Sequence, residues 1–357
     1  MIDAPDAWAT LAARIEAEGG TALLLGASDS GKTTLAQWLM RTLAAAGRRV
    51  AFLDGDIGQS TVGPPATVAL ALPTASSADS CLSPIALRFI GAVSPARQML
   101  PLAVSLKRLA DKAHALGAEV LLVDTTGLVL GPLGRRLKFH KIELLAPQHL
   151  IALQREEELE PILGLFDSRK GVVIHRFPVS PHVTPRSPQA RRLYRAQRFS
   201  AHFQSSRLLE LSLRDVVIQG AWLSGGRPLN LSELRGLSED LHTAVLGGIL
   251  GPDEAFLLVG GEPSLEGQPL ARSRLGVPAL SVVERDHTRG LLVGLADREN
   301  ELLALGLIHE LDFTSGRLVC RTPFDGRAQV RFVHTGTLRL DPSGEELGET
   351  ELLTGVS

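Results

Sequence analysis

Leu23-Leu24-Leu25-Gly26-Ala27-Ser28-Asp29-Ser30-Gly31-Lys32-Thr33-Thr34 is the stretch of sequence that decides the fold. It contains a complete G-x-x-x-x-G-K-T pattern, with an apolar run before it and a helix-compatible run, 35–43, after it. Gly26 and Gly31 permit backbone angles that a side chain would forbid, so successive N–H groups can point at one anion. The pattern in this context predicts a phosphate-binding loop between a strand and a helix.

The loop predicts a site for a nucleoside triphosphate, ATP or GTP, and the sequence leaves the choice between them open. The positive end of the following helix dipole strengthens such a site. Lys32 is expected to reach the β- and γ-phosphates, and the Thr33 hydroxyl to bind Mg²⁺. The residues expected to bind the nucleotide are Gly26, Ala27, Ser28, Asp29, Ser30, Gly31, Lys32, Thr33 and Thr34.

Carboxylates follow two further apolar runs of the sequence. The first run ends in Asp54-Gly55-Asp56-Ile57-Gly58-Gln59-Ser60, and the second, 121–123, ends in Asp124. The carboxyl ends of parallel strands meet at the edge of the sheet that carries the phosphate loop. Alternation along a strand points Asp54 and Asp56 the same way, so both are expected to face the site. Asp124 is expected on the magnesium side of the nucleotide.

Two basic stretches complete the pattern. Residues 186–199 hold five arginines and no acid, with Ser187 and Pro188 as N-cap and first residue of a helix. Like charges at helical spacing repel one another unless an anion compensates them. The stretch is therefore either a solvated basic face or an arginine lid over a transferring phosphate or a nucleic-acid backbone. A second run is expected at the surface or in contact with nucleic acid: Arg135, Arg136, Lys138 and Lys141.

Length and composition favour two globular units. The chain has 357 residues, 44% hydrophobic and 21% charged, with a formal net charge of −2, which excludes disorder as its main state. Short apolar runs alternate with helical patterns over the first two hundred residues, as in a parallel sheet with crossover helices. The segment 61–84 fits neither period and is interpreted as a long loop or lid. Beyond residue 208, β-prone runs and turn residues dominate.

The predicted fold class is α/β. We expect a P-loop NTPase domain with a mostly parallel sheet flanked by helices, over residues 1–205 and with its lid at about 183–203. A β-rich C-terminal domain is expected over 206–357. The two cysteines, Cys81 and Cys320, lie far apart in the sequence, which suits a reducing compartment. No apolar run is long enough to span a bilayer, so we expect a cytoplasmic protein with no membrane partner.

These segments together resemble the polynucleotide 5′-hydroxyl kinase family of Clp/Grc type, whose members act in pre-mRNA cleavage, tRNA splicing and ribosomal RNA processing. The chain is similar to its short microbial branch over residues 20–205, and more faintly at 304–308 and 322–324. The matching residues are Gly26–Thr34, Asp54–Ser60, Phe89–Pro95, Asp124–Gly127, Arg186 and Arg191.

The resemblance implies an enzyme that transfers the γ-phosphate of ATP or GTP to the 5′-hydroxyl of single-stranded RNA or DNA. Lys32, Asp56, Arg186 and Arg191 would be its catalytic residues, and Thr33 and Asp124 would hold Mg²⁺. Asp56 would orient or deprotonate the substrate hydroxyl. Two alternatives stay open on the residues alone: a GTPase or ATPase that acts as a switch or assembly factor, and a kinase for a small molecule. Protein partners are unknown from the sequence.

Overall fold

A computed structural model describes residues 6–73, 82–220, 226–350 and 353–354. The chain divides into two compact units, Met1–Arg195 and Ala196–Ser357. Helix α6 (Pro188–Phe203) crosses the point of division. The domain boundary expected after residue 205 follows this helix and stays a prediction.

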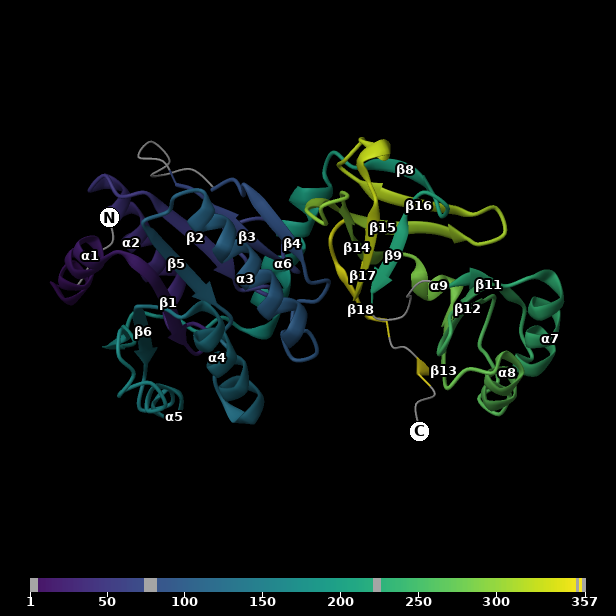
Figure 1. The fold of residues 1–357 in the computed structure, drawn as a ribbon, viewed down its shortest axis with the longest axis horizontal. Coiled ribbons are helices and arrows are strands. Elements are labelled where there is room, and N and C mark those ends of the chain that lie inside the picture. The colour runs from purple at the N-terminus through teal and green to yellow at the C-terminus, as the bar shows by residue number, and fades with distance from the viewer. Residues whose placement is uncertain (1–5, 74–81, 221–225, 351–352, 355–357) are drawn as a thin grey trace. The chain divides into compact units, whose positions relative to one another are not determined.

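A seven-stranded sheet organises the first unit, in the order β4-β3-β2-β5-β1-β6-β7. Strands β2, β5, β1, β6 and β7 are parallel, while β3 and β4 extend one edge as an antiparallel pair (Figure 1). The strands are β1 (Gly20–Gly26), β2 (Val50–Gly55), β3 (Thr67–Ala71), β4 (Ala86–Phe89), β5 (Val120–Thr125), β6 (His149–Gln154) and β7 (Val173–Pro178). Helix α1 (Asp6–Glu18) precedes the first strand and α6 follows the last, and the connecting helices are α2 (Lys32–Ala45), α3 (Met99–Ala115), α4 (Gly131–Leu145) and α5 (Glu160–Leu163).

Helices cover both faces of this sheet. Leu23 and Leu25 of β1 belong to one core, which they share with apolar residues of α3 and α4. Ala22 and Leu24 belong to the other core, against α1 and α2. Because successive strand residues point to opposite faces, a strand that is apolar at every position is the one a doubly covered sheet requires. The mostly parallel sheet flanked by helices agrees with the predicted fold.

The segment 61–84, expected as a loop or lid, contains a strand. Residues Thr67–Ala71 form β3, buried at all five positions and paired with β2 and β4. Its sequence, TVALA, shows no polar–apolar alternation because both of its faces are covered, so neither helical nor strand period is visible. The expectation of a loop is wrong for these residues; 74–81, with Cys81, lie outside the described part of the chain.

Two sheets make up the second unit. The larger has the order β18-β17-β14-β15-β16-β8, with β9 parallel to β17, and the smaller the order β10-β11-β12-β13-β19. Helices α7 (Leu231–Leu241) and α8 (Gly267–Leu275) share a core with the smaller sheet. The strands are β8 (Arg207–Ser212), β9 (Val217–Gly220), β10 (Arg227–Pro228), β11 (Val245–Leu250), β12 (Glu254–Val259), β13 (Ala279–Glu284), β14 (Leu291–Ala296), β15 (Leu302–Asp312), β16 (Arg317–Thr322), β17 (Phe332–Leu340), β18 (Glu346–Glu349) and β19 (Leu353–Thr354). Two short elements, α9 (Arg285–Thr288) and the 3₁₀ helix η1 (Arg327–Gln329), complete the unit.

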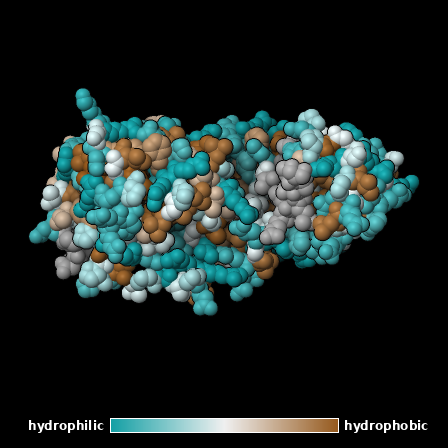
Figure 2. Space-filling model, turned by 90° about the horizontal axis from the view of Figure 1, so that it is seen from below, coloured by the Kyte–Doolittle hydropathy of each residue, from teal (hydrophilic) through white to brown (hydrophobic). Residues whose placement is uncertain are grey.

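On the face that Figure 2 shows, hydrophobic side chains occur in small groups between hydrophilic ones. Among the described residues, no helix combines the length and the apolar character needed to cross a membrane.

Candidate active site

The phosphate loop joins β1 to α2 in the backbone conformation that its glycines permit. Gly31 has φ 88° and Asp29 has φ 53°. A Cβ on Gly26 would lie 2.4 Å from Ser30 Oγ and 2.8 Å from the Leu153 carbonyl oxygen, so no side chain fits there. Gly31 gives α2 no side-chain cap, which leaves the first N–H groups of this helix available to an anion.

Lys32 folds back across the loop. Its Nζ donates to the Ala27 carbonyl oxygen at 2.7 Å and to Ser30 Oγ at 3.4 Å. Burial lowers the pKa of Lys32, and the nearby carboxylates of Asp124 and Asp56 oppose that shift. The Lys32 ammonium group is thus held beside the loop by two oxygens, which phosphate oxygens could replace.

Thr33 and Asp124 meet at the other side of the loop. Thr33 Oγ1 donates to Asp124 Oδ2 at 2.6 Å, and the second carboxylate oxygen of Asp124 accepts from the Thr125 N–H at 2.8 Å. Asp124 is 2% exposed, and this burial raises its pKa. The structure thus brings the two predicted metal ligands into direct contact.

Asp54 and Asp56 differ in what they do. Asp54 is buried, and its Oδ2 accepts from the N–H groups of Thr61 and Val62 at 2.6 and 2.9 Å. Burial and the Asp124 charge raise the pKa of Asp54 to about 7. Asp56 instead lines a cavity beside the phosphate loop, and its Oδ1 accepts from the N–H groups of Gly58 and Gln59 at 3.1 and 3.0 Å. The expectation that both carboxylates face the site is therefore wrong for Asp54, which holds the following loop.

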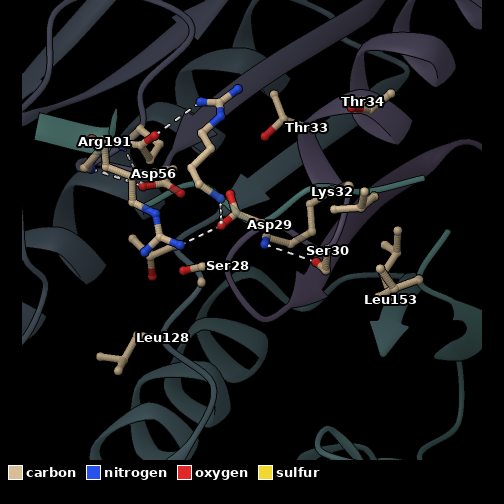
Figure 3. A pocket seen from close by; sticks show the side chains of 18 of the residues that line it. Ser28, Asp29, Ser30, Lys32, Thr33, Thr34, Asp56, Leu128, Leu153 and Arg191 are labelled. Atoms are coloured by element: carbon tan, nitrogen blue, oxygen red, sulfur yellow. Dashed lines mark hydrogen bonds and ion pairs between the residues drawn. The ribbon is translucent and has the colours of Figure 1, made fainter. Parts of the chain in front are cut away.

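The arginine-rich stretch reaches the phosphate loop through Arg186 and Arg191. Arg191 Nη2 lies 2.5 Å from Asp29 Oδ2, which also accepts from the Arg186 N–H at 3.0 Å (Figure 3). The Arg186 guanidinium donates to Gln59 Oε1 at 3.3 Å and lies 5.6 Å from the centroid of the Tyr194 ring. Helix α6 begins at Pro188 as predicted, and Ser187 Oγ accepts from the Ala190 N–H at 3.1 Å. The compensating anion that the sequence lacks locally is Asp29.

Most of these groups line one cavity of about 1140 Å³. Of the predicted site residues, ten line it: Ser28, Asp29, Ser30, Gly31, Lys32, Thr33, Thr34, Asp56, Arg186 and Arg191. Gly26, Ala27 and Asp124 do not line it. Gly26 and Ala27 belong to the backbone of the loop, and Asp124 accepts a hydrogen bond from Thr33, which does line the cavity. Further walls come from residues 93–96, 126–128 and 178–184. The cavity is large enough for a nucleotide together with a second substrate.

Sequence reasoning missed three features of the site. Trp8 of α1 lines the cavity, and its ring lies 5.6 Å from that of Trp38. The Tyr194 hydroxyl donates to the Ser60 carbonyl oxygen at 2.8 Å, which ties α6 to the loop after Asp56. A Cβ on Gly127 would lie 2.2 Å from Ser28 Oγ, so this glycine allows the segment after β5 to touch the phosphate loop.

Lys138 and Lys141 are fully buried, and the expectation that they lie at the surface or contact nucleic acid is wrong. Lys138 Nζ donates to Thr125 Oγ1 at 2.7 Å and to the Thr126 carbonyl oxygen, so it fixes the segment after Asp124. Lys141 Nζ is buried without a hydrogen-bond partner in the described part of the chain, and burial lowers its pKa to about 8. Arg135 and Arg136 of the same run are exposed.

Comparison with known proteins agrees with this geometry. The family described as mRNA cleavage and polyadenylation factor CLP1 P-loop matches residues 26–205, half of the chain. The chain belongs to this family. Family membership and the predicted fold class, a P-loop unit followed by a β-rich unit, are thereby confirmed.

The sequence similarity to individual relatives extends over almost the whole chain. A polyribonucleotide 5′-hydroxyl-kinase of Thermococcus kodakarensis is 33% identical over 92% of this chain and 90% of its own length. The corresponding proteins of Pyrococcus horikoshii and Methanocaldococcus jannaschii are each 31% identical, over 92% and 91% of this chain and 88% of their own lengths. A chain in the structure of the wild-type Clp1p–Pcf11p complex has the same fold, with TM-score 0.60 at 14% identity over 94% of this chain and 79% of that one.

Proposed function

We infer that this chain is a polyribonucleotide 5′-hydroxyl kinase, a phosphotransferase that uses a nucleoside triphosphate. The observation that carries the inference is its similarity to kinases of that name over nine-tenths of its length. The site supports the same function, because a phosphate loop, a carboxylate and two arginines surround one cavity. A kinase can use these groups to bind the triphosphate, to accept the proton of the attacking hydroxyl and to neutralise the transferring phosphate.

We propose a role for each of four residues. The 5′-hydroxyl oxygen of the polynucleotide forms a bond to the γ-phosphorus, and the bond from that phosphorus to the β–γ bridging oxygen breaks. Asp56 accepts the hydroxyl proton, and the nucleoside diphosphate leaves. Lys32 follows the γ-phosphate through the transition state. Arg186 and Arg191 neutralise the charge that develops on the equatorial oxygens, with Arg191 leaving Asp29 to do so.

Mg²⁺ fits the donor set of the site. Thr33 and Asp124 place a hydroxyl and a carboxylate oxygen side by side, and Mg²⁺ prefers oxygen ligands and takes few of them from protein. Within the described ranges no group of three or more His, Cys, Asp or Glu side chains could hold an ion. Thr33 and Asp124 would therefore share the ion with the nucleotide phosphates, whose negative charge it would partly neutralise.

A labelling experiment tests the function. The protein is incubated with γ-labelled ATP or GTP and with RNA and DNA oligonucleotides of one sequence, each bearing either a 5′-hydroxyl or a 5′-phosphate. We expect label on the 5′-hydroxyl oligonucleotides alone, and none with Lys32→Ala. Release of free phosphate without labelled oligonucleotide would instead support a switch. Label on a free nucleoside, offered as the acceptor in a parallel reaction, would support a small-molecule kinase. The same assay decides between ATP and GTP and between RNA and DNA.

A further inference from the structure

A second cavity, of about 490 Å³, lies in the unit Ala196–Ser357 and is lined by four arginines. They come from three segments of the unit. Arg214 lies in the turn between β8 and β9, Arg298 in the turn between β14 and β15, and Arg327 and Arg331 in or just after η1. Among the described residues that line this cavity, the only carboxylate is that of Asp215. Four cations thus face one anion.

The cavity is held by backbone contacts and by buried apolar residues. Arg331 Nη1 donates to the Asp215 carbonyl oxygen at 2.6 Å, and the N–H of Val217 donates to the Arg331 carbonyl oxygen at 2.8 Å. Leu211, Val216 and Val330 line the hollow and are 1%, 7% and 5% exposed, because they belong to the core of the unit. The arginines therefore surround a floor that the fold itself keeps in place.

Three of the four guanidinium groups have no partner among the described residues. Within the ranges that the structure describes, the side chains of Arg214, Arg298 and Arg327 have no hydrogen-bond or ion-pair partner. Some other exposed arginines of this unit pair with carboxylates, as Arg207 does with Asp325 and Arg274 with Asp240. Guanidinium groups that converge without acidic partners bind phosphate groups well, since each offers several donors in a fixed plane.

We propose that this cavity, the arginine hollow, is a second binding site for single-stranded polynucleotide. The arginines would bind backbone phosphates, and the apolar floor would contact a ribose or base. The volume falls within the range of about 300–1,000 Å³ that ligand sites occupy. The proposal rests on the proposed function, because a polynucleotide kinase handles a chain that carries many phosphates besides the terminus that reacts.

Binding measurements with the full chain test the proposal. The probe is a 3′-labelled, 5′-phosphorylated oligoribonucleotide of about 20 nucleotides, longer than the ~4–16 nucleotides that one single-strand-binding module covers. It cannot be phosphorylated further, so binding is measured apart from transfer. Fluorescence anisotropy is recorded over a salt series for the wild type, Arg298→Ala/Arg327→Ala and the control Arg235→Ala/Arg285→Ala. The control removes two exposed arginines elsewhere in the same unit.

We expect Arg298→Ala/Arg327→Ala, the hollow variant, to bind the RNA roughly tenfold more weakly than the wild type. The slope of log K against log salt should become shallower by about 1.4, since each of the two lost phosphate contacts to a single strand contributes ~0.7. The control should match the wild type. Arg298→Lys/Arg327→Lys should restore most of the binding, because the charge is kept, and thermal unfolding of all variants verifies the fold. Unchanged binding in the hollow variant would overturn the proposal.

Two further readouts separate the proposal from its alternatives. If a poly-glutamate peptide of equal charge displaces the RNA as well as unlabelled RNA does, and needs the same arginines, the hollow binds acidic protein segments and the proposal is wrong. Phosphoryl transfer to a 5′-hydroxyl dinucleotide should be equal in the hollow variant and the wild type. If the wild type transfers no phosphate but still binds RNA through these arginines, the kinase assignment is wrong and the proposed binding site is not affected.

Discussion

Arg191 of helix α6 and Asp29 of the phosphate loop form an ion pair of 2.5 Å at the place where a triphosphate would bind. The same Asp29 oxygen accepts the Arg186 N–H. The carboxylate is therefore the counter-anion of Arg191 in this structure. A γ-phosphate offers Arg191 more negative charge than Asp29 does, so nucleotide binding would exchange one partner for the other.

Asp29→Asn should make the lid less ordered without nucleotide. Arg191 then loses its charged partner, and the arginines of α6 repel one another. We expect faster tryptic cleavage at residues 186–198, and nucleotide binding a few-fold tighter because an anion near the phosphates is gone. Limited proteolysis and calorimetric titration measure both effects. Asp111→Asn, which removes an exposed acid of α3, is the control, and an unchanged cleavage rate would contradict the role given to Asp29.

Asp54, near the end of β2, and Asp56, just after the strand, should have different roles: Asp56 in the reaction and Asp54 in stability. Asp56→Asn keeps the size but loses the proton acceptor, so kcat should fall at least ~10²-fold while nucleotide affinity is kept. Asp54→Ala removes the acceptor of the Thr61 and Val62 N–H groups, and the loss at the buried Val62 N–H costs about 1–3 kcal/mol of unfolding free energy. Transfer kinetics and urea unfolding decide the matter; equal loss of stability in both variants would argue against this division.

Asp124→Asn should change the metal dependence of the reaction. The amide keeps one oxygen near Thr33 but removes the charge that favours a divalent cation. We expect the Mg²⁺ concentration for half-maximal transfer to rise about tenfold or more, with partial recovery at high Mg²⁺. A magnesium titration of initial rates, with chelator as zero point, measures the effect. A variant whose rate falls equally at every Mg²⁺ concentration would show that Asp124 does not act through the metal.

Lys141→Met should stabilise the protein, because Lys141 Nζ is buried without a hydrogen-bond partner in the described chain. Its pKa of about 8 in the folded state lies below the ordinary 10.5, so charging it costs on the order of 3 kcal/mol at neutral pH. Between about pH 8 and 10.5 the unfolded chain keeps a proton that the folded chain has lost. Wild-type stability therefore rises with pH through this window, and the advantage of Met should shrink over the same range.

Unfolding at several pH values tests the Lys141→Met prediction, and Lys138→Met serves as the contrast. Lys138 donates to Thr125 Oγ1 and to the Thr126 carbonyl oxygen, so its loss frees the segment that lines the cavity after Asp124. We expect Lys138→Met to reduce kcat, whereas Lys141→Met should change it little. A Lys141→Met protein whose stability advantage is constant with pH would show that titration of Lys141 is not the cause.

The phosphate loop and the parallel sheet could be predicted because their signals are local. Strand, glycines and helix follow one another within residues 20–45. The carboxyl ends of parallel strands also lie at the same edge of a sheet, so the residues that follow them are close together. The burial of Lys138 and Lys141 had a local signal too, since they share a helix face with Leu137, Ile142 and Leu145. Their charge concealed it. Strand β3 had a weaker signal, because a buried run of only five residues without alternation does not by itself indicate a strand.

Contacts between distant segments were beyond a single sequence. Asp29 and Arg191 are 162 positions apart, and only the folded sheet and the course of the chain into α6 bring them together. The split between Asp54 and Asp56 was equally hidden. Strand alternation ends at Gly55, where β2 ends, so the direction of Asp56 is set by the turn and not by the strand.

Arg191→Ala should depress turnover at saturating substrate, because the guanidinium stabilises charge that develops only in the transition state. We expect kcat to fall by about 10²–10³, with a much smaller change in KM. Arg41→Ala, an exposed arginine of α2, is the control and should behave as the wild type. Transfer kinetics over a salt series measure both, and a loss confined to KM for the oligonucleotide would make Arg191 a binding residue only.

One indirect cause needs its own variant, because Arg191→Ala also leaves Asp29 without its partner. If the unpaired carboxylate repelled the nucleotide, Asp29→Asn/Arg191→Ala would recover the rate. We expect no recovery, since the missing group is the cation itself, and we expect Arg191→Lys to recover only part of the rate because a lysine cannot offer two donors in one plane. A double variant with wild-type turnover would show that Arg191 serves to neutralise Asp29 and takes no part in the transfer.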